Sequence, residues 1–175
     1  PLVEALCGIL PGMESGRVAR EIRKLWQEQL ESAREIDGAS PLLRSLKELG
    51  IRLGVISNIW HPFYQGLAQR RPSLVETLDY KILSYRKGLM KPSTELYREA
   101  LEACGEPPQD CWMVGDTYEL DVAPAMHLGM RTVWVLNRPE KEKVSLVGVL
   151  RGEKPSPDWV TGDLGEVERF FSRKG

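Results

Sequence analysis

The sequence predicts an α/β fold with a doubly wound parallel sheet and a partial helical cap at the N-terminus. Three observations support this prediction. Short apolar segments alternate with helical segments from residue 53 onward, the first 38 residues are helical in pattern, and polar residues directly follow several of the apolar segments. Alternation of strand and helix is typical of parallel sheets that are covered by helices on both faces.

The N-terminal part of the chain has the pattern of an amphipathic helix at 18–36. Val18, Ile22 and Leu25 recur at helical spacing with charged residues between them. Gly38 then breaks the pattern. We therefore predict that residues 1–38 are the remnant of a helical cap and that residues 39–175 form the α/β core.

A second helix follows directly. Ser40 has the character of an N-cap, and Pro41 suits the first helical position. Leu42 and Leu46 then fall on one face, and Gly50 ends the helix. This helix precedes the first strand of the core.

From Gly50 onward, strands and helices alternate in a regular order. The predicted strands are short and apolar, whereas the predicted helices carry apolar residues at a spacing of three or four. In order, we expect a strand at 53–56, a helix or turn region at 62–78, a strand at 80–84, a helix at 94–104, a strand at 112–114, a helix at 120–128, a strand at 132–136, a long loop or insertion at 138–157, a short strand at 159–160 and a helix at 167–171.

Charge and composition exclude several classes of protein. The 24 Lys and Arg residues nearly balance the 25 Asp and Glu residues and are interspersed with them, so the net charge is -1. No field large enough to attract nucleic acid or an anionic membrane follows from this balance. No apolar run reaches the roughly 18 residues that a membrane span needs, and no signal-peptide pattern begins the sequence. We expect no nucleic-acid or membrane partner.

The cysteines favour a reducing compartment. Cys7, Cys104 and Cys111 are odd in number and show no CxxC spacing. Such a set fits reduced thiols better than a disulfide framework or a zinc site. We therefore expect a cytoplasmic protein.

The first candidate site residues follow the strand at 53–56. Ser57 and Asn58 present a hydroxyl and amides at the carboxyl end of that strand, where ligands of open parallel sheets bind. These groups can donate hydrogen bonds to an anion without adding charge. A plain turn or helix cap is the alternative interpretation.

Lys91 is the second candidate. Pro92 disfavours a helical conformation for the preceding lysine and holds it extended before the helix at 94–104. An ammonium group held in this way could bind a phosphate. The alternative is a solvated loop lysine.

The segment from Gly115 to Asp121 is more specific. An apolar strand ends at Asp116, and Asp121 lies in the first turn of the next helix. Two carboxylates brought to about 4 Å repel by roughly 4 kcal/mol at an effective dielectric constant of 20, so another group must offset the repulsion, and a divalent cation is the ordinary solution. A hard cation that binds one or two carboxylates, waters and a phosphate is magnesium. The alternative to a metal site is structural. Asp116 would then belong to a turn, and Asp121 would be favoured at a helix N-terminus by the helix dipole.

Together these segments resemble the haloacid dehalogenase (HAD) superfamily of phosphatases and related hydrolases. Ser57 stands in Val-Ile-Ser-Asn, and Lys91 stands in Lys-Gly-Leu-Met-Lys-Pro-Ser-Thr-Glu-Leu-Tyr. Gly115 and Asp116 form a Gly-Asp pair that is followed by Asp121. The order and spacing of these motifs match the family.

The resemblance covers about residues 39–165 and implies a Rossmann-like core. It implies that Ser57 and Lys91 hold the transferring phosphoryl group, that Asp116 binds Mg²⁺ and that Asp121 supports it. It further implies a small phosphorylated metabolite as substrate.

The family's first motif is absent from this sequence. That motif is an Asp-x-Asp pair after an apolar strand, and no Asp-x-Asp occurs here. Asp37 follows helical sequence rather than a strand, so we reject it as a nucleophile. In the family, the first strand lies between the strands that end at Ser57 and Asp116, so its absence is expected to split the sheet. We expect the chain as given to be inactive and to bind Mg²⁺ weakly or not at all, because the first motif supplies a ligand in the family. We also expect a strand to be supplied by a further segment or by another chain, for example in a dimer.

Three alternatives remain. An inactive family member could bind a phosphorylated ligand or a protein partner. A haloacid dehalogenase would keep the fold, but such enzymes do not use the Gly-Asp motif at 115–116. A receiver-like signalling domain would need an acidic cluster at its start, which is absent.

Overall fold

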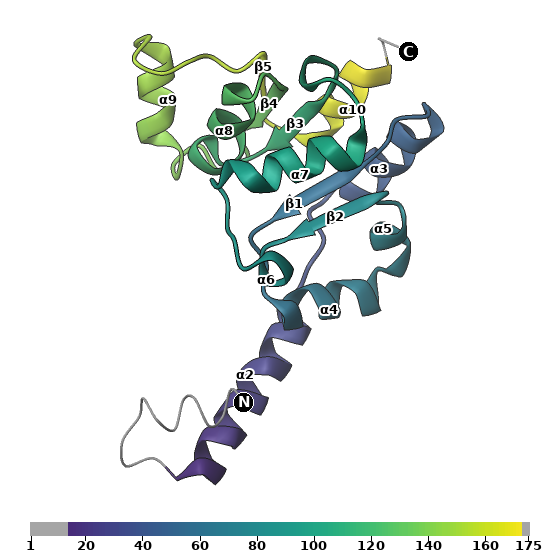
Figure 1. Ribbon diagram of the computed structural model, residues 1–175, viewed down its shortest axis with the longest axis vertical. Coiled ribbons are helices and arrows are strands. Elements are labelled where there is room, and N and C mark those ends of the chain that lie inside the picture. The colour runs from purple at the N-terminus through teal and green to yellow at the C-terminus, as the bar shows by residue number, and fades with distance from the viewer. Residues whose placement is uncertain (1–13, 173–175) are drawn as a thin grey trace. The chain divides into compact units, whose positions relative to one another are not determined.

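A computed structural model describes residues 14–172 of the chain (Figure 1). Cys7 and the rest of residues 1–13 of the predicted cap lie outside the described residues, as do residues 173–175. The described chain forms two compact units, one with residues 14–35 and Trp60–Pro72 and the other with Ile36–Ile59 and 73–172. The assignment of residues 1–38 to a cap stays a prediction.

The first unit is a pair of packed helices, α2 (Ser15–Ser32) and α4 (His61–Arg70). A Cβ atom on Gly66 of α4 would lie only 2.1 Å from the carbonyl oxygen of Leu30 in α2. The absence of a side chain at Gly66 therefore permits the close approach of the two helices. The amphipathic helix predicted at 18–36 is present, but it begins at Ser15 and ends at Ser32.

Arginine side chains close the C-terminal end of α2. Arg34 donates to the carbonyl oxygens of Glu31 and Ala33, and Arg70 donates to those of Leu30 and Ala33. The last carbonyl groups of a helix have no partners within it, so these guanidinium groups satisfy them.

The remaining elements of the described chain alternate between helix and strand as predicted. They are α3 (Ala39–Glu48), β1 (Gly54–Ser57), α5 (Pro72–Glu76), β2 (Tyr80–Leu83), α6 (Ser84–Lys87), α7 (Thr94–Cys104), the 3-10 turn η1 (Pro108–Asp110), β3 (Trp112–Gly115), the π-helical turn η2 (Tyr118–Val122), α8 (Ala123–His127), β4 (Arg131–Val135), α9 (Lys143–Leu150), β5 (Trp159–Thr161) and α10 (Leu164–Ser172).

All strand pairs of the second unit are parallel, which confirms the predicted α/β class. The strands form two sheets, a two-stranded sheet in the order β1-β2 and a three-stranded sheet in the order β3-β4-β5. Within residues 14–172, β1 and β3 each pair on one side only. Ile56 of β1 and Met113 of β3 nevertheless pack against the same buried cluster, which includes Ile82 and Tyr97. The two sheets thus share one apolar cluster.

Strand β4 is buried on both faces. Val133 and Val135 pack in a cluster with Leu42 of α3 and Val167 of α10, whereas Trp134 packs in a separate cluster with Tyr118. Successive side chains of a strand point to opposite faces, so each face of β4 has its own cluster. The two-layer covering predicted from the sequence is present around this strand.

The prediction of a long loop or insertion at 138–157 is wrong in part, because this segment contains helix α9. Leu146 and Val149 of this helix pack against the cluster of Tyr118 and Trp134. The segment is apolar on all sides, so it lacks the periodicity that marks an amphipathic helix, and packing decides its structure.

Two further helical predictions are refined. The helix predicted at 120–128 begins as the π-helical turn η2 and continues as α8. The region predicted at 62–78 is divided into α4 and α5. Helix α7 coincides with its predicted bounds.

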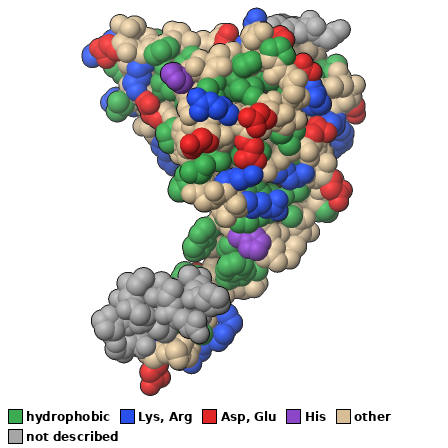
Figure 2. Space-filling model, in the orientation of Figure 1, with side chains coloured by type: hydrophobic (Ala, Val, Ile, Leu, Met, Phe, Trp, Pro, Cys, Tyr) green, Lys and Arg blue, Asp and Glu red, His purple; other side chains and the backbone are tan. Residues whose placement is uncertain are grey.

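On the face shown in Figure 2, acidic and basic side chains are intermixed rather than gathered by sign. This distribution agrees with the net charge of -1. Among the described residues, no helix has the length and apolar character needed to cross a membrane.

Candidate functional site

The predicted site residues lie where parallel strands end. Ser57 is the last residue of β1, and Asn58 follows it. Asp116 directly follows β3, and Asp121 lies in the turn η2. Lys91 lies in the turn before α7 and is not helical, as predicted, and its peptide bond to Pro92 is cis. Carboxyl ends of parallel strands are the usual ligand-binding edge of such sheets.

Asn58 and Lys91 are joined through the backbone of the lysine. The side-chain Nδ2 of Asn58 donates to the carbonyl oxygen of Lys91 at 3.1 Å, and the Lys91 backbone N–H donates to Oδ1 of Asn58 at 2.7 Å. This pair of bonds fixes the turn that carries Lys91. The Asn58 side chain thus positions the lysine.

The Lys91 side chain reaches Asp121. Its Nζ lies 2.5 Å from Oδ1 of Asp121, and the two side chains are only 13% and 5% exposed. The other carboxylate oxygen, Oδ2, accepts a hydrogen bond from the backbone N–H of Thr117 at 3.0 Å. The charge of Asp121 is therefore compensated inside the protein. The sequence pattern placed both residues at the site but did not pair them.

Gly115 allows Asp121 to take this position. A Cβ atom on Gly115 would lie 2.3 Å from the Cβ of Asp121, so any larger residue would push the aspartate away. The hydroxyl of Tyr97 donates to the carbonyl oxygen of Leu120, next to Asp121. Burial raises the pKa of the Tyr97 hydroxyl, and the Asp121 carboxylate raises it further. Tyr97 thus stays a neutral donor to the turn.

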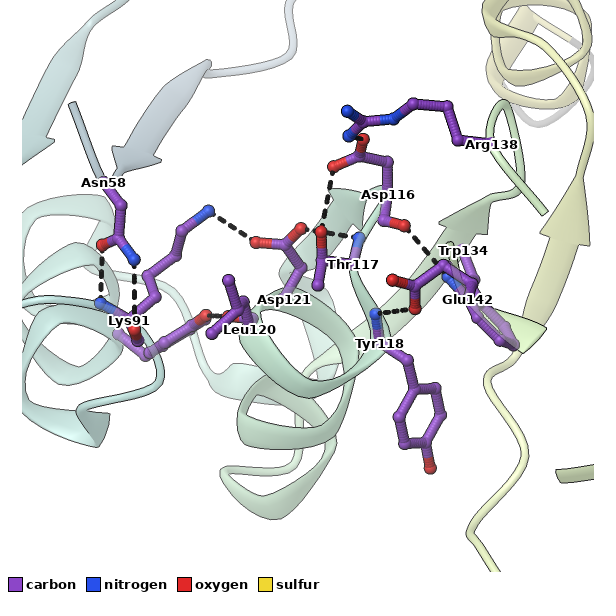
Figure 3. Close-up of polar contacts among 11 residues, drawn as sticks. Asn58, Lys91, Asp116, Thr117, Tyr118, Leu120, Asp121, Trp134, Arg138 and Glu142 are labelled. Carbon is purple, nitrogen blue, oxygen red and sulfur yellow. Dashed lines mark hydrogen bonds and ion pairs between the residues drawn. The ribbon is translucent and has the colours of Figure 1, made fainter. Parts of the chain in front are cut away.

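Asp116 is the more accessible carboxylate, with its side chain 31% exposed. Its Oδ2 forms an ion pair with Nη2 of Arg138, and its Oδ1 accepts a hydrogen bond from the Thr117 hydroxyl at 3.4 Å. The indole N–H of Trp134 donates to the Asp116 carbonyl oxygen at 3.3 Å. In Figure 3 the two carboxylates lie between the Lys91 ammonium and the Arg138 guanidinium.

The segment between β4 and β5 braces the turn η2. The backbone N–H of Tyr118 donates to Oε2 of Glu142 at 2.8 Å, and the Tyr118 hydroxyl donates to the carbonyl oxygen of Pro155 at 2.7 Å. Lys154 forms an ion pair with Glu119 and donates a hydrogen bond to it. This hydrogen bond raises the pKa of the Lys154 ammonium. The segment predicted as a loop therefore holds the turn that presents Asp121. Arg138 and Glu142 were not predicted as site residues, and no motif marks them.

Comparison with known proteins identifies the family. The family model for haloacid dehalogenase-like hydrolases matches residues 13–129. The chain belongs to this family. The resemblance inferred from Ser57, Lys91 and the segment at 115–121 is thereby confirmed.

Individual relatives in the HAD family include phosphatases. The chain is 36% identical over 101 residues to a glyceraldehyde 3-phosphate phosphatase of Pyrococcus abyssi, covering 58% of this chain and 42% of that protein. It is 32% identical over 131 residues to a phosphoserine phosphatase of Thermus thermophilus, covering 74% of this chain and 48% of that protein. The chain therefore spans about half the length, or less, of these curated relatives.

A solved structure of the family supports the fold. The crystal structure of the HAD-hydrolase YfnB from Bacillus subtilis, bound to magnesium, matches with a TM-score of 0.66 at 19% identity. The match covers 98% of this chain and 69% of that chain. The arrangement of parallel strands and helices described above is thus the fold of a HAD hydrolase.

The donor set of the site bears on the metal that the HAD fold implies. Among the described residues, no group of three or more His, Cys, Asp or Glu side chains could hold a metal ion. Asp121 already binds Lys91 and Thr117, whereas Asp116 presents a partly exposed hard oxygen donor. Magnesium keeps several waters and needs only one or two protein carboxylates. Asp116 fits as a ligand, and Asp121 fits as its support.

Ser57 is half-buried at the end of β1. Within the described part of the chain, its hydroxyl makes no hydrogen bond to the other candidate residues. Its predicted convergence with Lys91 on one phosphate, and the phosphate-binding role of Asn58, stay predictions.

Proposed function

We propose that this chain is part of a magnesium-dependent phosphatase that hydrolyses a small phosphomonoester. The pairing of Lys91 with Asp121 is the observation that carries this proposal. It brings the lysine that precedes α7 to the turn that follows β3, in a chain that belongs to a hydrolase family. The names of the Pyrococcus and Thermus relatives, which are phosphatases of small phosphate esters, support the substrate class.

The proposed roles follow from the donors that remain available. An ammonium group has three N–H donors, and Lys91 uses one of them on Asp121. The others can neutralise the charge of a transferring phosphoryl group. The Ser57 hydroxyl and the Asn58 backbone N–H would donate to the phosphoryl oxygens from the end of β1. Asp121 would hold the Lys91 side chain in place.

Asp116 would hold the magnesium ion. When bound, the ion would polarise a phosphoryl oxygen and orient the substrate. Asp116 can release its present partner, Arg138, because that ion pair is partly exposed. Trp134 and Thr117 would keep the Asp116 backbone and side chain at the end of β3.

The nucleophile is proposed to come from a strand between β1 and β3. Within the described residues, these two strands have unpaired edges next to a shared apolar cluster. Backbone N–H and C=O groups need partners, so a parallel strand there would satisfy both edges. An aspartate at the carboxyl end of this strand would form the covalent aspartyl-phosphate intermediate.

A second function, binding without catalysis, is favoured by one observation. Both carboxylates of the site are paired with cationic side chains, Asp116 with Arg138 and Asp121 with Lys91. A protein that keeps only the lysine and serine groups would bind a phosphorylated ligand and leave it intact. The two functions differ in turnover.

The test is hydrolysis of 4-nitrophenyl phosphate in the presence of magnesium. A longer form of the protein that includes the proposed strand is expected to be active, and the chain as given is expected to be inactive. In the longer form, Asp116→Asn should abolish activity, whereas Asp121→Asn should weaken it less. Lys87→Met, which removes an exposed lysine from α6, is the control and should retain activity.

Two results would refute the proposal. Equal activity of the wild-type protein and Asp116→Asn would remove the metal assignment. Absence of turnover in the longer form, with phosphate still bound, would favour the binding function instead.

A further inference from the structure

The two ion pairs at the site differ in their exposure to solvent. Lys91 and Asp121 are 13% and 5% exposed, whereas Arg138 and Asp116 are 49% and 31% exposed. An exposed ion pair contributes little to stability, because water screens it. A buried pair leaves an uncompensated charge when it is broken, which is far more costly. The Arg138 pair is therefore the exchangeable one.

The loop that carries Arg138 is anchored at both ends. At its start, the backbone N–H of Leu136 donates to the carbonyl oxygen of Thr161 at 2.7 Å. At its end, Glu142 accepts the backbone N–H of Tyr118 at 2.8 Å. Arg138 can thus leave the Asp116 carboxylate while its backbone stays beside the site.

We propose that Arg138 is an anion-binding residue of this site. Its guanidinium stays paired with the Asp116 carboxylate until a divalent cation binds that carboxylate. The released guanidinium then binds an anionic oxygen of the phosphorylated ligand. This inference rests on the proposed function, because it requires the cation at Asp116. A guanidinium group suits the second role, since its donors match two oxygens of a phosphate or a carboxylate at once.

A purely structural role for Arg138 predicts the opposite effect on cation binding. If Arg138 only held Asp116 in place, its removal would loosen the carboxylate and weaken cation binding. If Arg138 competes with the cation, its removal strengthens binding. The sign of the change therefore separates the two roles.

The test uses the chain as it exists and the indole N–H signal of Trp134 in NMR. This group donates to the Asp116 carbonyl oxygen and reports on the end of β3. Titration with Mg²⁺, and broadening by Mn²⁺, detect cation binding even at millimolar affinity. Arg138→Gln should bind the cation about two- to fivefold more tightly than the wild-type protein, the range set by an exposed ion pair. Lys141→Gln removes the same charge from the same loop and should change the affinity less.

Inorganic phosphate supplies the second measurement. With the cation present, Arg138→Gln should bind phosphate about fivefold more weakly than the wild-type protein, because one exposed charged contact is lost. Without the cation, the two proteins should bind phosphate alike, since Arg138 is then held on Asp116.

Unchanged or weaker cation binding by Arg138→Gln would overturn the inference, as would unchanged phosphate binding in the presence of the cation. Cation binding by the Asp116→Asn variant shows whether the inference about Arg138 fails alone or together with the proposed function. If Asp116→Asn abolishes cation binding while Arg138→Gln changes nothing, only the role of Arg138 is wrong. If Asp116→Asn binds the cation normally, both proposals fail. If the wild-type chain binds no cation, the inference about Arg138 fails, whereas the proposed function still stands on the longer form.

Discussion

The ammonium nitrogen of Lys91 lies 2.5 Å from Oδ1 of Asp121, across 30 residues of sequence. The lysine precedes α7 and the aspartate follows β3, so this contact ties the end of the β1-β2 sheet to the end of the β3-β4-β5 sheet. Both side chains are buried, which makes the contact sensitive to the loss of either partner. The predictions below begin with this pair.

Lys91→Met should lower the free energy of unfolding by about 3 kcal/mol at pH 7, because it leaves the Asp121 carboxylate buried without a cation. Urea unfolding measures this change. Lys87→Met is the matched control, since Lys87 lies at the same 2.5 Å from Glu99 but the two side chains are 37% and 38% exposed. The control substitution should lower the free energy of unfolding by less than about 1 kcal/mol. Equal losses for the two variants would show that burial of the Lys91 pair has no energetic consequence.

Gly115→Ala should destabilise the protein by about 1 to 3 kcal/mol and displace Asp121. The new methyl group would lie 2.3 Å from the Cβ of Asp121, and neither the end of β3 nor the turn η2 can yield without moving the carboxylate. Thermal unfolding and the backbone NMR shifts of residues 115–121 check this. Gly162→Ala is the control, because nothing lies within 4 Å of its Cβ position. An unchanged stability of the Gly115→Ala variant would contradict the geometry of the turn.

Gly66→Ala should separate α2 from α4, since the added Cβ would lie 2.1 Å from the carbonyl oxygen of Leu30. We expect a loss of about 1 to 3 kcal/mol and faster hydrogen exchange in α2. Gly16→Ala makes the same substitution in α2 with only the end of Arg20 near it, at 3.8 Å. That control should be neutral or slightly stabilising, because alanine favours the helix over glycine. Unchanged exchange in Gly66→Ala would argue against the tight packing of the pair.

Cys111 should react slowly with iodoacetamide in the folded protein. Burial, and then the neighbouring Cys104 thiol 3.7 Å away, raise the pKa of Cys111 from 9.0 to about 11. Because the thiolate is the nucleophile, alkylation at pH 8 should be about a hundredfold slower than in the urea-unfolded chain. Mass spectrometry of the Cys111 peptide measures both rates.

The same pKa shift sets a pH dependence of stability. Between pH 9 and pH 11 the unfolded chain releases the Cys111 proton while the folded chain retains it, so the free energy of unfolding should fall as pH rises through this window. Cys111→Ala should reduce the slope. Alkylation at the same rate in folded and unfolded protein would contradict the shift itself.

Local signals explain the parts of the fold that could be predicted. Helix α7 was predicted within its observed bounds, because Pro92 precedes its start and its apolar residues fall at helical spacing. In the structure, Gly105 ends the helix in the left-handed conformation. The short strands were found for a similar reason, since apolar residues between turn signals specify them without reference to the rest of the chain. Helix α9 was missed because its apolar residues show no periodicity, and contacts with the distant Tyr118 and Trp134 stabilise it.

The sequence by itself determined the family, the parallel α/β class and the positions of Ser57, Lys91, Asp116 and Asp121 at strand or loop ends, because these features depend on residue type and short-range spacing. Only the tertiary structure decided the partners of these residues. It placed Lys91 on Asp121 and Arg138 on Asp116, and it committed the Asn58 side chain to the backbone of Lys91. Such pairings join segments that lie 22 to 33 residues apart, so they depend on how strands and turns meet in space rather than on any local pattern.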